Sequence, residues 1–287
     1  MHAILTSIQI LFKLLAILPA AVGGKLAFRL FCRPLNRKIR KRELGFYQEA
    51  RHFLLRSQDP PIHAYELGQA DGQLVILVHG WEGNAGNFYE IAKALAATGH
   101  RVISLDFPAH GKSDVPSTNL KVMADALIAL LEALQPKEPF SIVSHSFGSA
   151  VTSYALAGQS WKIDQLIFLT SPNVLIDILR FFQGMMKFND RIFDNFAKRV
   201  EKVAGRHPAD TIVGELVKEI EHDQLTIIHD QYDQVLPYAN STAIAQMVPA
   251  ANLIPIDHVG HYRMLWDEEV VSRIGTLLNS PQKQQVH

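Results

Sequence analysis

An apolar run that breaks abruptly into a serine-containing turn is the feature that most constrains this chain. Residues 140–150 read Phe-Ser-Ile-Val-Ser-His-Ser-Phe-Gly-Ser-Ala. The run ending at Val143 predicts a buried strand, and the small residues that follow predict the start of a helix. Small residues on either side of Ser146, at Ser144 and Gly148, let strand and helix approach closely, and the strained turn pushes the serine hydroxyl out of the sheet. Ser146 is therefore a candidate nucleophile.

The rest of the chain from Ile62 alternates short apolar runs with segments of helical periodicity. Strands are predicted at 62–67, 74–78, 102–105, 140–143, 166–169, 225–228 and 253–256, and helices at 88–97, 120–134, 239–247 and 264–278. Strands separated by helices of this length predict an α/β fold, with a mostly parallel central sheet and helices on both faces. The length of 287 residues fits one such domain with an insertion.

Residues 173–223 interrupt this alternation. Apolar side chains recur there at helical intervals among charges, and no segment resembles a strand. We predict a helical insertion that divides the core into residues 43–172 and 224–287. Phe182 and Met186 either pack the insertion onto the core or line a hydrophobic substrate pocket as parts of a lid. Both interpretations predict the same helical periodicity, so both stay open.

The first 42 residues differ in composition from the rest. They carry nine Lys or Arg and no Asp or Glu, so residues 43–287 have a net charge of −9 and the whole chain is neutral. Residues 3–22 are mostly apolar, interrupted by Lys13 and Pro19. A basic cluster from Arg29 to Arg42 follows, in which Phe31 is the one aromatic residue, and this scarcity of aromatic residues favours anionic lipid over nucleic acid.

This order predicts a peripheral or shallow anchor at the cytoplasmic face of a membrane, because basic flanks stay cytoplasmic and Lys13 disfavours a spanning helix. The alternative is a helix packed on the body of the protein. A cleaved signal peptide is disfavoured, since its charges would precede the apolar core.

Cysteine and histidine usage bear on metal sites. Cys32 is the single cysteine, which excludes an intramolecular disulfide, and the 13 histidines show no metal-binding spacing. We expect neither a metal nor another cofactor.

Five motifs occur in the order of a known family. They are His79-Gly80-Trp81, residues 106–113 (Asp-Phe-Pro-Ala-His-Gly-Lys-Ser), the serine turn, residues 230–237 (Asp-Gln-Tyr-Asp-Gln-Val-Leu-Pro) and Gly260-His261-Tyr262. Over residues 62–280 the chain resembles the α/β-hydrolase superfamily, in particular its lid-bearing serine esterase and lipase-like branch. Three positions depart from the family pattern, with Ser144, Ala109 and Asp230 where glycine is common.

The resemblance and the order serine, acid, histidine imply a catalytic triad of Ser146, Asp233 and His261. A serine hydroxyl needs a base within hydrogen-bond reach, and that base needs a carboxylate to orient it. His258 competes with His261 as the base. Asp230 competes with Asp233 as the acid, whereas Asp257 lies too close in sequence to His261.

The resemblance also implies an oxyanion hole formed by the backbone N–H groups of Trp81 and Phe147. The Trp81 ring is then a wall of the substrate pocket. His79, His110 and Asp106 are predicted to brace loops.

Two functional interpretations follow. One is a serine hydrolase that cleaves a carboxylic ester or related acyl bond in a small, moderately apolar substrate. The other is a catalytically silent member of the fold that binds or scaffolds at a membrane. Retention of nucleophile, acid and base favours the enzyme. An aspartate would stand at position 146 in a dehalogenase or epoxide hydrolase of this fold, so Ser146 disfavours both.

Overall fold

A computed structural model describes residues 2–56 and 60–279. Its centre is an eight-stranded sheet in the order β1-β2-β4-β3-β5-β6-β7-β8. β1 pairs with β2, and β2 with β4, in antiparallel fashion, whereas all later pairings are parallel. The strands are β1 (Arg51–Leu55), β2 (Ile62–Gly68), β3 (Leu74–Val78), β4 (Arg101–Asp106), β5 (Phe140–His145), β6 (Ile163–Leu169), β7 (His222–Asp230) and β8 (Asn252–Ile256).

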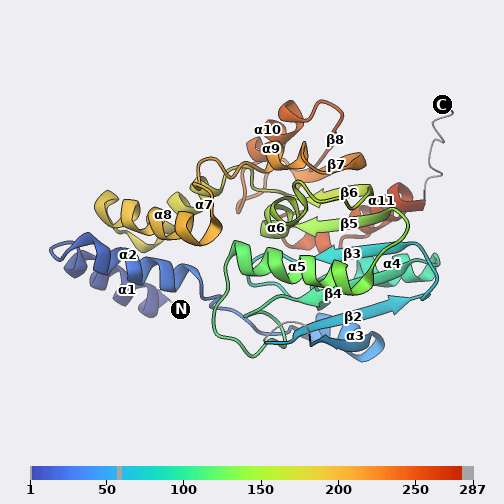
Figure 1. Cartoon of the computed structure of the whole chain (residues 1–287), viewed down its shortest axis with the longest axis horizontal. Coiled ribbons are helices and arrows are strands. Elements are labelled where there is room, and N and C mark those ends of the chain that lie inside the picture. The colour runs from blue at the N-terminus through green and yellow to red at the C-terminus, as the bar shows by residue number, and fades with distance from the viewer. Residues whose placement is uncertain (1, 57–59, 280–287) are drawn as a thin grey trace.

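Two hydrophobic cores cover the two faces of the sheet (Figure 1). One face packs against α5 (Leu120–Leu134), α6 (Phe147–Leu156), α9 (Val213–Val217) and α10 (Ala239–Met247). The other packs against α3 (Leu44–Glu49), α4 (Tyr89–Ala97) and α11 (Glu268–Asn279). The central strands β3 and β5 are buried almost throughout, as expected of parallel strands covered on both faces.

Four helices form a separate layer beyond the carboxyl ends of the strands, at the left of Figure 1. They are α1 (His2–Leu15), α2 (Ala20–Phe31), α7 (Leu175–Met186) and α8 (Asp190–Ala204). We call this layer the cap. α7 and α8 come from the segment between β6 and β7, whereas α1 and α2 form a hairpin at the start of the chain.

The α1–α2 hairpin packs against α8 through a close helix crossing. A Cβ on Gly23 would lie 2.7 Å from Ile192 Cδ1, and a Cβ on Gly24 would lie 2.6 Å from Asn195 Cβ. α2 and α8 therefore approach at a distance that only glycine permits. From α1, Phe12 is buried with its ring 4.9 Å from that of Phe188.

The predicted α/β-hydrolase fold is confirmed, with differences at its edges. β1 was not predicted, because its apolar run is short and lies outside the matching motifs. β7 begins at His222, so its first two residues fall inside the predicted insertion 173–223. Residues 1–42, predicted as an N-terminal segment that either anchors to a membrane or packs on the body, contribute α1 and α2 to the same layer as that insertion. Among the described residues, no helix is long and apolar enough to cross a membrane.

Candidate active site

Ser146 lies between β5 and α6 with φ 54° and ψ −126°, a conformation that L-residues rarely adopt. Its backbone N–H donates to the carbonyls of Leu169 and Thr170, both at 3.0 Å. At Gly148 an added Cβ would lie 2.5 Å from the carbonyl oxygen of Val78. Glycine at that position is therefore what lets α6 begin against β3. Ser144 tolerates its side chain, because its hydroxyl pairs with that of Thr152 at 2.7 Å.

The loops after β7 and β8 bring Asp233 and His261 to this turn. His261 Nε2 lies 3.0 Å from Ser146 Oγ, and His261 Nδ1 lies 2.7 Å from Asp233 Oδ2. With Nδ1–H donating to the carboxylate, Nε2 is left to accept the serine proton. The side chains of His261 and Asp233 are almost completely buried. The three residues expected to form a triad thus lie in one hydrogen-bonded chain.

Backbone donors fix the orientation of the Asp233 carboxylate. Oδ1 accepts the N–H groups of Val235 at 2.7 Å and Leu236 at 3.0 Å, so Oδ2 is left to face His261. Burial raises the pKa of Asp233, but hydrogen bonds from His229 and His261 outweigh that effect and hold the pKa well below its ordinary value. Asp233 is therefore ionised at neutral pH.

A buried polar pair, which the sequence did not reveal, supports the same oxygen. Thr170 Oγ1 donates to Asp233 Oδ2 at 3.1 Å and lies 2.8 Å from His229 Nε2. His229 is completely buried, and its Nδ1 lies 2.6 Å from Ser241 Oγ. Thr170 has a positive φ of 50°. Neither Thr170 nor His229 belongs to a motif, and only the packing of β6 beside β7 brings them to Asp233.

The competing residues have other contacts. Asp230 Oδ1 accepts the N–H groups of Tyr232 at 2.8 Å and His258 at 3.2 Å, and Oδ2 accepts that of Gly260. Asp230 thus holds the loop that carries His261. Asp257 accepts a hydrogen bond from a glutamine side chain, and the His258 ring stacks on Tyr232 with 4.2 Å between centroids.

Three further histidines surround the site, and all three are buried. His145 Nε2 lies 2.9 Å from the carbonyl oxygen of His261, so it braces the backbone of that residue. Burial lowers the pKa of His79 to about 4, that of His110 to about 3 and that of His145 to about 3. All three are neutral at neutral pH. His145 was not singled out from the sequence, although it directly precedes the candidate nucleophile.

The loops around the turn are braced as the sequence predicted. Asp106 accepts hydrogen bonds from the hydroxyls of Tyr47 at 2.9 Å and Tyr65 at 3.0 Å, and from two backbone N–H groups. His79 Nε2 accepts the N–H of Phe107, and His110 Nε2 accepts that of Glu82. Ala109 keeps the loop conformation that glycine usually adopts, with φ 67°.

Trp81 and Phe147, whose backbone N–H groups are predicted to form an oxyanion hole, lie beside each other. Phe147 is the first residue of α6, whose initial N–H groups have no acceptor within the helix. The Trp81 ring meets that of Phe147 edge-on, with centroids 5.8 Å apart, so the loop after β3 lies beside the start of α6.

The cap meets the loop after β3 through an aromatic cluster. Phe31, at the end of α2, stacks on Trp81 with centroids 6.1 Å apart and meets Phe182 and Phe196 edge-on at 5.2 and 5.3 Å. Phe182 and Met186, predicted to bind substrate, are buried within the cap. A hollow of about 20 Å³ beside this cluster is lined by Phe28, Phe31 and Phe147 among others. The cap therefore contacts the loop beside the site, with Phe31 from the first helices in that contact, and Ser146 itself is partly exposed.

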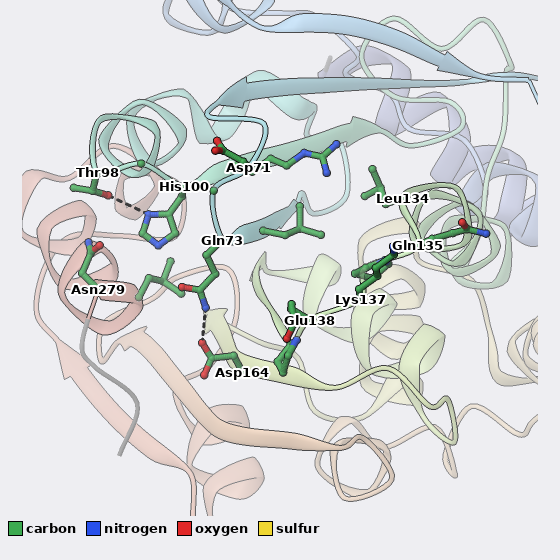
Figure 2. A pocket seen from close by; sticks show the side chains of 17 residues that line it. Asp71, Gln73, Thr98, His100, Leu134, Gln135, Lys137, Glu138, Asp164 and Asn279 are labelled. Atoms are coloured by element: carbon green, nitrogen blue, oxygen red, sulfur yellow. Dashed lines mark hydrogen bonds between the residues drawn. The ribbon is translucent and has the colours of Figure 1, made fainter. Parts of the chain in front are cut away.

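A larger hollow of about 880 Å³ lies elsewhere (Figure 2). Its wall includes Leu74, Arg101 and Asp164, which lie at the starts of strands, so it opens at the opposite edge of the sheet from Ser146. Ligands of such sheets bind at the carboxyl ends of the strands. Over the described parts of the chain, no group of three or more His, Cys, Asp or Glu could hold a metal ion.

Comparison with known proteins identifies the class. Residues 73–213 match the family described as alpha/beta hydrolase fold, and the chain belongs to the α/β-hydrolase superfamily. An esterase of Pyrococcus furiosus superposes with a TM-score of 0.63 at 18% identity, covering 86% of this chain and 97% of that one. A bacterial membrane phospholipase A superposes with a TM-score of 0.63 at 15% identity, covering 97% of this chain and 98% of that one.

Sequence relatives match in shorter segments. A serine hydrolase-like protein of Dictyostelium discoideum is 36% identical over 107 residues, covering 36% of this chain and 30% of the relative. Methylesterase 3 of Arabidopsis thaliana is 29% identical over 133 residues, covering 42% of this chain and 51% of the relative. The matches thus span about a third to a half of the curated relatives. They support hydrolase chemistry in general terms.

Proposed function

We propose that the protein is a serine hydrolase that cleaves a carboxylic ester or related acyl bond through an acyl-enzyme. The observation that carries this proposal is the hydrogen-bonded chain from Ser146 Oγ through His261 to Asp233, with contacts of 3.0 and 2.7 Å. Such a chain supplies an activated nucleophile and a base held in one tautomer. A purely binding protein would not need all three groups in this order.

In the first half-reaction Ser146 Oγ attacks the acyl carbon while its proton passes to His261 Nε2. Asp233 stabilises the resulting imidazolium. The tetrahedral intermediate collapses, the bond to the leaving oxygen breaks, and His261 gives its proton to that oxygen. Water then attacks the acyl-enzyme with His261 as the base, and collapse of the second intermediate releases the acid and restores Ser146.

The oxyanion of both intermediates would be held by the N–H groups of Trp81 and Phe147. Loss of one such donor typically costs about 3 kcal/mol of transition-state stabilisation. These are backbone groups, so side-chain substitution leaves them in place. The positive φ of Ser146 aims its hydroxyl toward the same region.

The substrate class follows from the surroundings of Ser146. The side chains above it are aromatic and apolar, including Phe31, Phe147 and Trp81, which favours an apolar acyl chain over a charged one. Names of similar proteins, such as methylesterase and phospholipase, agree with ester substrates. Because the hollow beside Phe31 and Phe147 measures only about 20 Å³, we infer that the cap moves to admit an acyl chain.

Hydrolysis of nitrophenyl esters of increasing chain length tests the proposal. We expect turnover of esters by the purified full chain and its loss in Ser146→Ala, with unchanged melting temperature. Ser144→Ala, two residues away, is the matched control and should keep its activity. If the wild-type protein hydrolyses no ester and no thioester yet binds acyl ligands, the catalytically silent interpretation replaces the enzyme.

A further inference from the structure

The tip of the α1–α2 hairpin exposes an unusual number of apolar side chains. Of the fifteen large apolar side chains that are exposed in the described part of the chain, eight lie on α1, α2, the turn between them and the adjoining α7. We call these eight the hairpin surface: Ile10, Leu11, Leu14, Ile17, Leu18, Val22, Phe181 and Met185. Single exposed apolar residues are ordinary, but a gathering of them marks an interaction site.

The members of the hairpin surface lie together. Gln9 Nε2 donates to the carbonyl of Met185 at 2.9 Å, so α1 adjoins α7 where Phe181 and Met185 are exposed. Ile17 is 85% exposed and Leu14 61% exposed, at the turn between the helices. In Figure 1 this turn is the part of the molecule farthest to the left, away from the sheet. No part of the body that the structure describes lies beyond it to cover these side chains.

Basic side chains continue the exposed face of α2. Val22, Lys25 and Arg29 are exposed at intervals of three and four residues, which places them on one face of the helix. Lys13 is exposed on α1. Within the described residues, no carboxylate lies within ion-pair distance of Lys13, Lys25 or Arg29. The apolar tip is thus followed by uncompensated positive charge.

The packing of the hairpin fixes how it can meet a lipid bilayer. α1 has 14 residues and α2 has 12, lengths of roughly 21 and 18 Å that fall short of a hydrocarbon core of about 30 Å. Each helix also packs one face on the rest of the cap, α1 through Phe12 and α2 through the crossing of Gly23 and Gly24 with α8. A helix so packed lies in the interface, with apolar side chains below the headgroups and lysines snorkelling among them.

We propose that the hairpin surface binds an anionic lipid membrane, with the α1–α2 turn inserted to the level of the acyl chains and Lys13, Lys25 and Arg29 among the headgroups. The charge selects this partner over an apolar protein groove, since residues 1–42 hold nine basic and no acidic side chains. This inference goes beyond the proposed hydrolase activity and does not depend on it.

Vesicle co-sedimentation tests the inference, with the full chain carrying Ser146→Ala so that no lipid is consumed. Vesicles of phosphatidylcholine alone are compared with vesicles containing phosphatidylglycerol. We expect binding to the anionic vesicles that weakens at high salt. Leu14→Asp with Ile17→Asp should lower the partition coefficient by about 100-fold or more. Lys25→Gln with Arg29→Gln should lower it by about 30-fold, roughly fivefold for each residue.

The matched control replaces two exposed apolar residues outside the hairpin surface, Leu44→Asp with Val122→Asp, and should bind as the parent does. Absence of binding to both vesicle types overturns the inference, as does undiminished binding by the Leu14→Asp, Ile17→Asp double variant. Sedimentation velocity covers the other occupant. If the parent protein binds no vesicles but forms a dimer, and this double variant is a monomer, the hairpin surface is an interface with a second copy of the chain.

Discussion

Asp233 and Asp230 stand three residues apart, and their hydrogen bonds predict opposite consequences of the same substitution. In Asp233→Asn the amide oxygen must stay on the N–H groups of Val235 and Leu236, which need an acceptor. The amide NH₂ then faces His261 Nδ1. Because NH₂ donates, Nδ1 must become the acceptor, and the ring proton moves to Nε2. His261 then points an N–H at Ser146 and is unable to take its proton.

The size of the loss follows from this tautomer. In a triad with the wrong tautomer kcat falls about 10⁴-fold, which is roughly 5 kcal/mol of transition-state stabilisation. Substrate binding uses other groups, so KM should change little. In Asp230→Asn the amide would instead turn a donor toward one of the three backbone N–H groups that the carboxylate accepts. That loses about 2 kcal/mol of stability, while kcat should fall less than tenfold.

Steady-state kinetics and thermal unfolding of the two variants, with the same ester, separate these effects. Asp233→Asn should melt near the wild-type temperature with almost no turnover. Asp230→Asn should melt several degrees lower and keep most of its turnover. The reverse ranking in kcat would refute the reasoning and transfer the orienting role to Asp230.

Three other predictions concern the surroundings of the site. His79, His110 and His145 have lowered pKa values in the folded protein, so the unfolded chain binds more protons below about pH 6.5. The free energy of unfolding should therefore fall by roughly 6 kcal/mol between pH 8 and pH 5. A free energy of unfolding, measured with urea, that stays constant over this range would contradict the prediction. Thr170→Val should lower kcat about tenfold and move the acid limb of the kcat/KM pH profile to higher pH, because Asp233 loses a hydrogen-bond donor. Thr170→Ser, which keeps the hydroxyl, should have the wild-type profile. An acid limb that does not move in Thr170→Val would mean that Thr170 only packs. Phe31→Ala should shift the ratio of kcat/KM for long over short acyl chains about tenfold toward the longer chains. Phe188→Ala, in the same cluster but without contact to Trp81, should only lower the stability of the fold. If the two variants have the same chain-length profile, the acyl chain binds elsewhere.

The local parts of the fold could be predicted from the sequence. Buried parallel strands such as β3 are continuous apolar runs, and the helix at 120–134 has the bounds that periodicity predicts for it. β1 escaped prediction because an edge strand of five residues, partly exposed, has no such run. The serine turn was predictable for another reason, since strand, small residues and helix start must follow one another directly in the chain.

Contacts between distant segments were not predictable where no family motif marks them. The competition between Asp230 and Asp233 could not be decided from spacing, because it depends on which carboxylate has backbone donors on the side away from His261. Thr170 and His229 come together only across neighbouring strands. The apolar start of the chain fits both a packed helix and a membrane-facing one. The structure shows that α1 has a packed face and an exposed one, with Phe12 buried and Leu14 exposed. Membrane binding by the exposed face stays a proposal.

The central claim is that Ser146 is the nucleophile of a serine hydrolase, and the site of covalent labelling tests it most directly. The full chain is treated with a fluorophosphonate, digested, and the modified residue located by mass spectrometry. The account predicts a single adduct on the peptide containing Ser146, absent in Ser146→Ala and formed much more slowly in His261→Gln. An adduct on a different serine, or labelling that persists in Ser146→Ala, would contradict it.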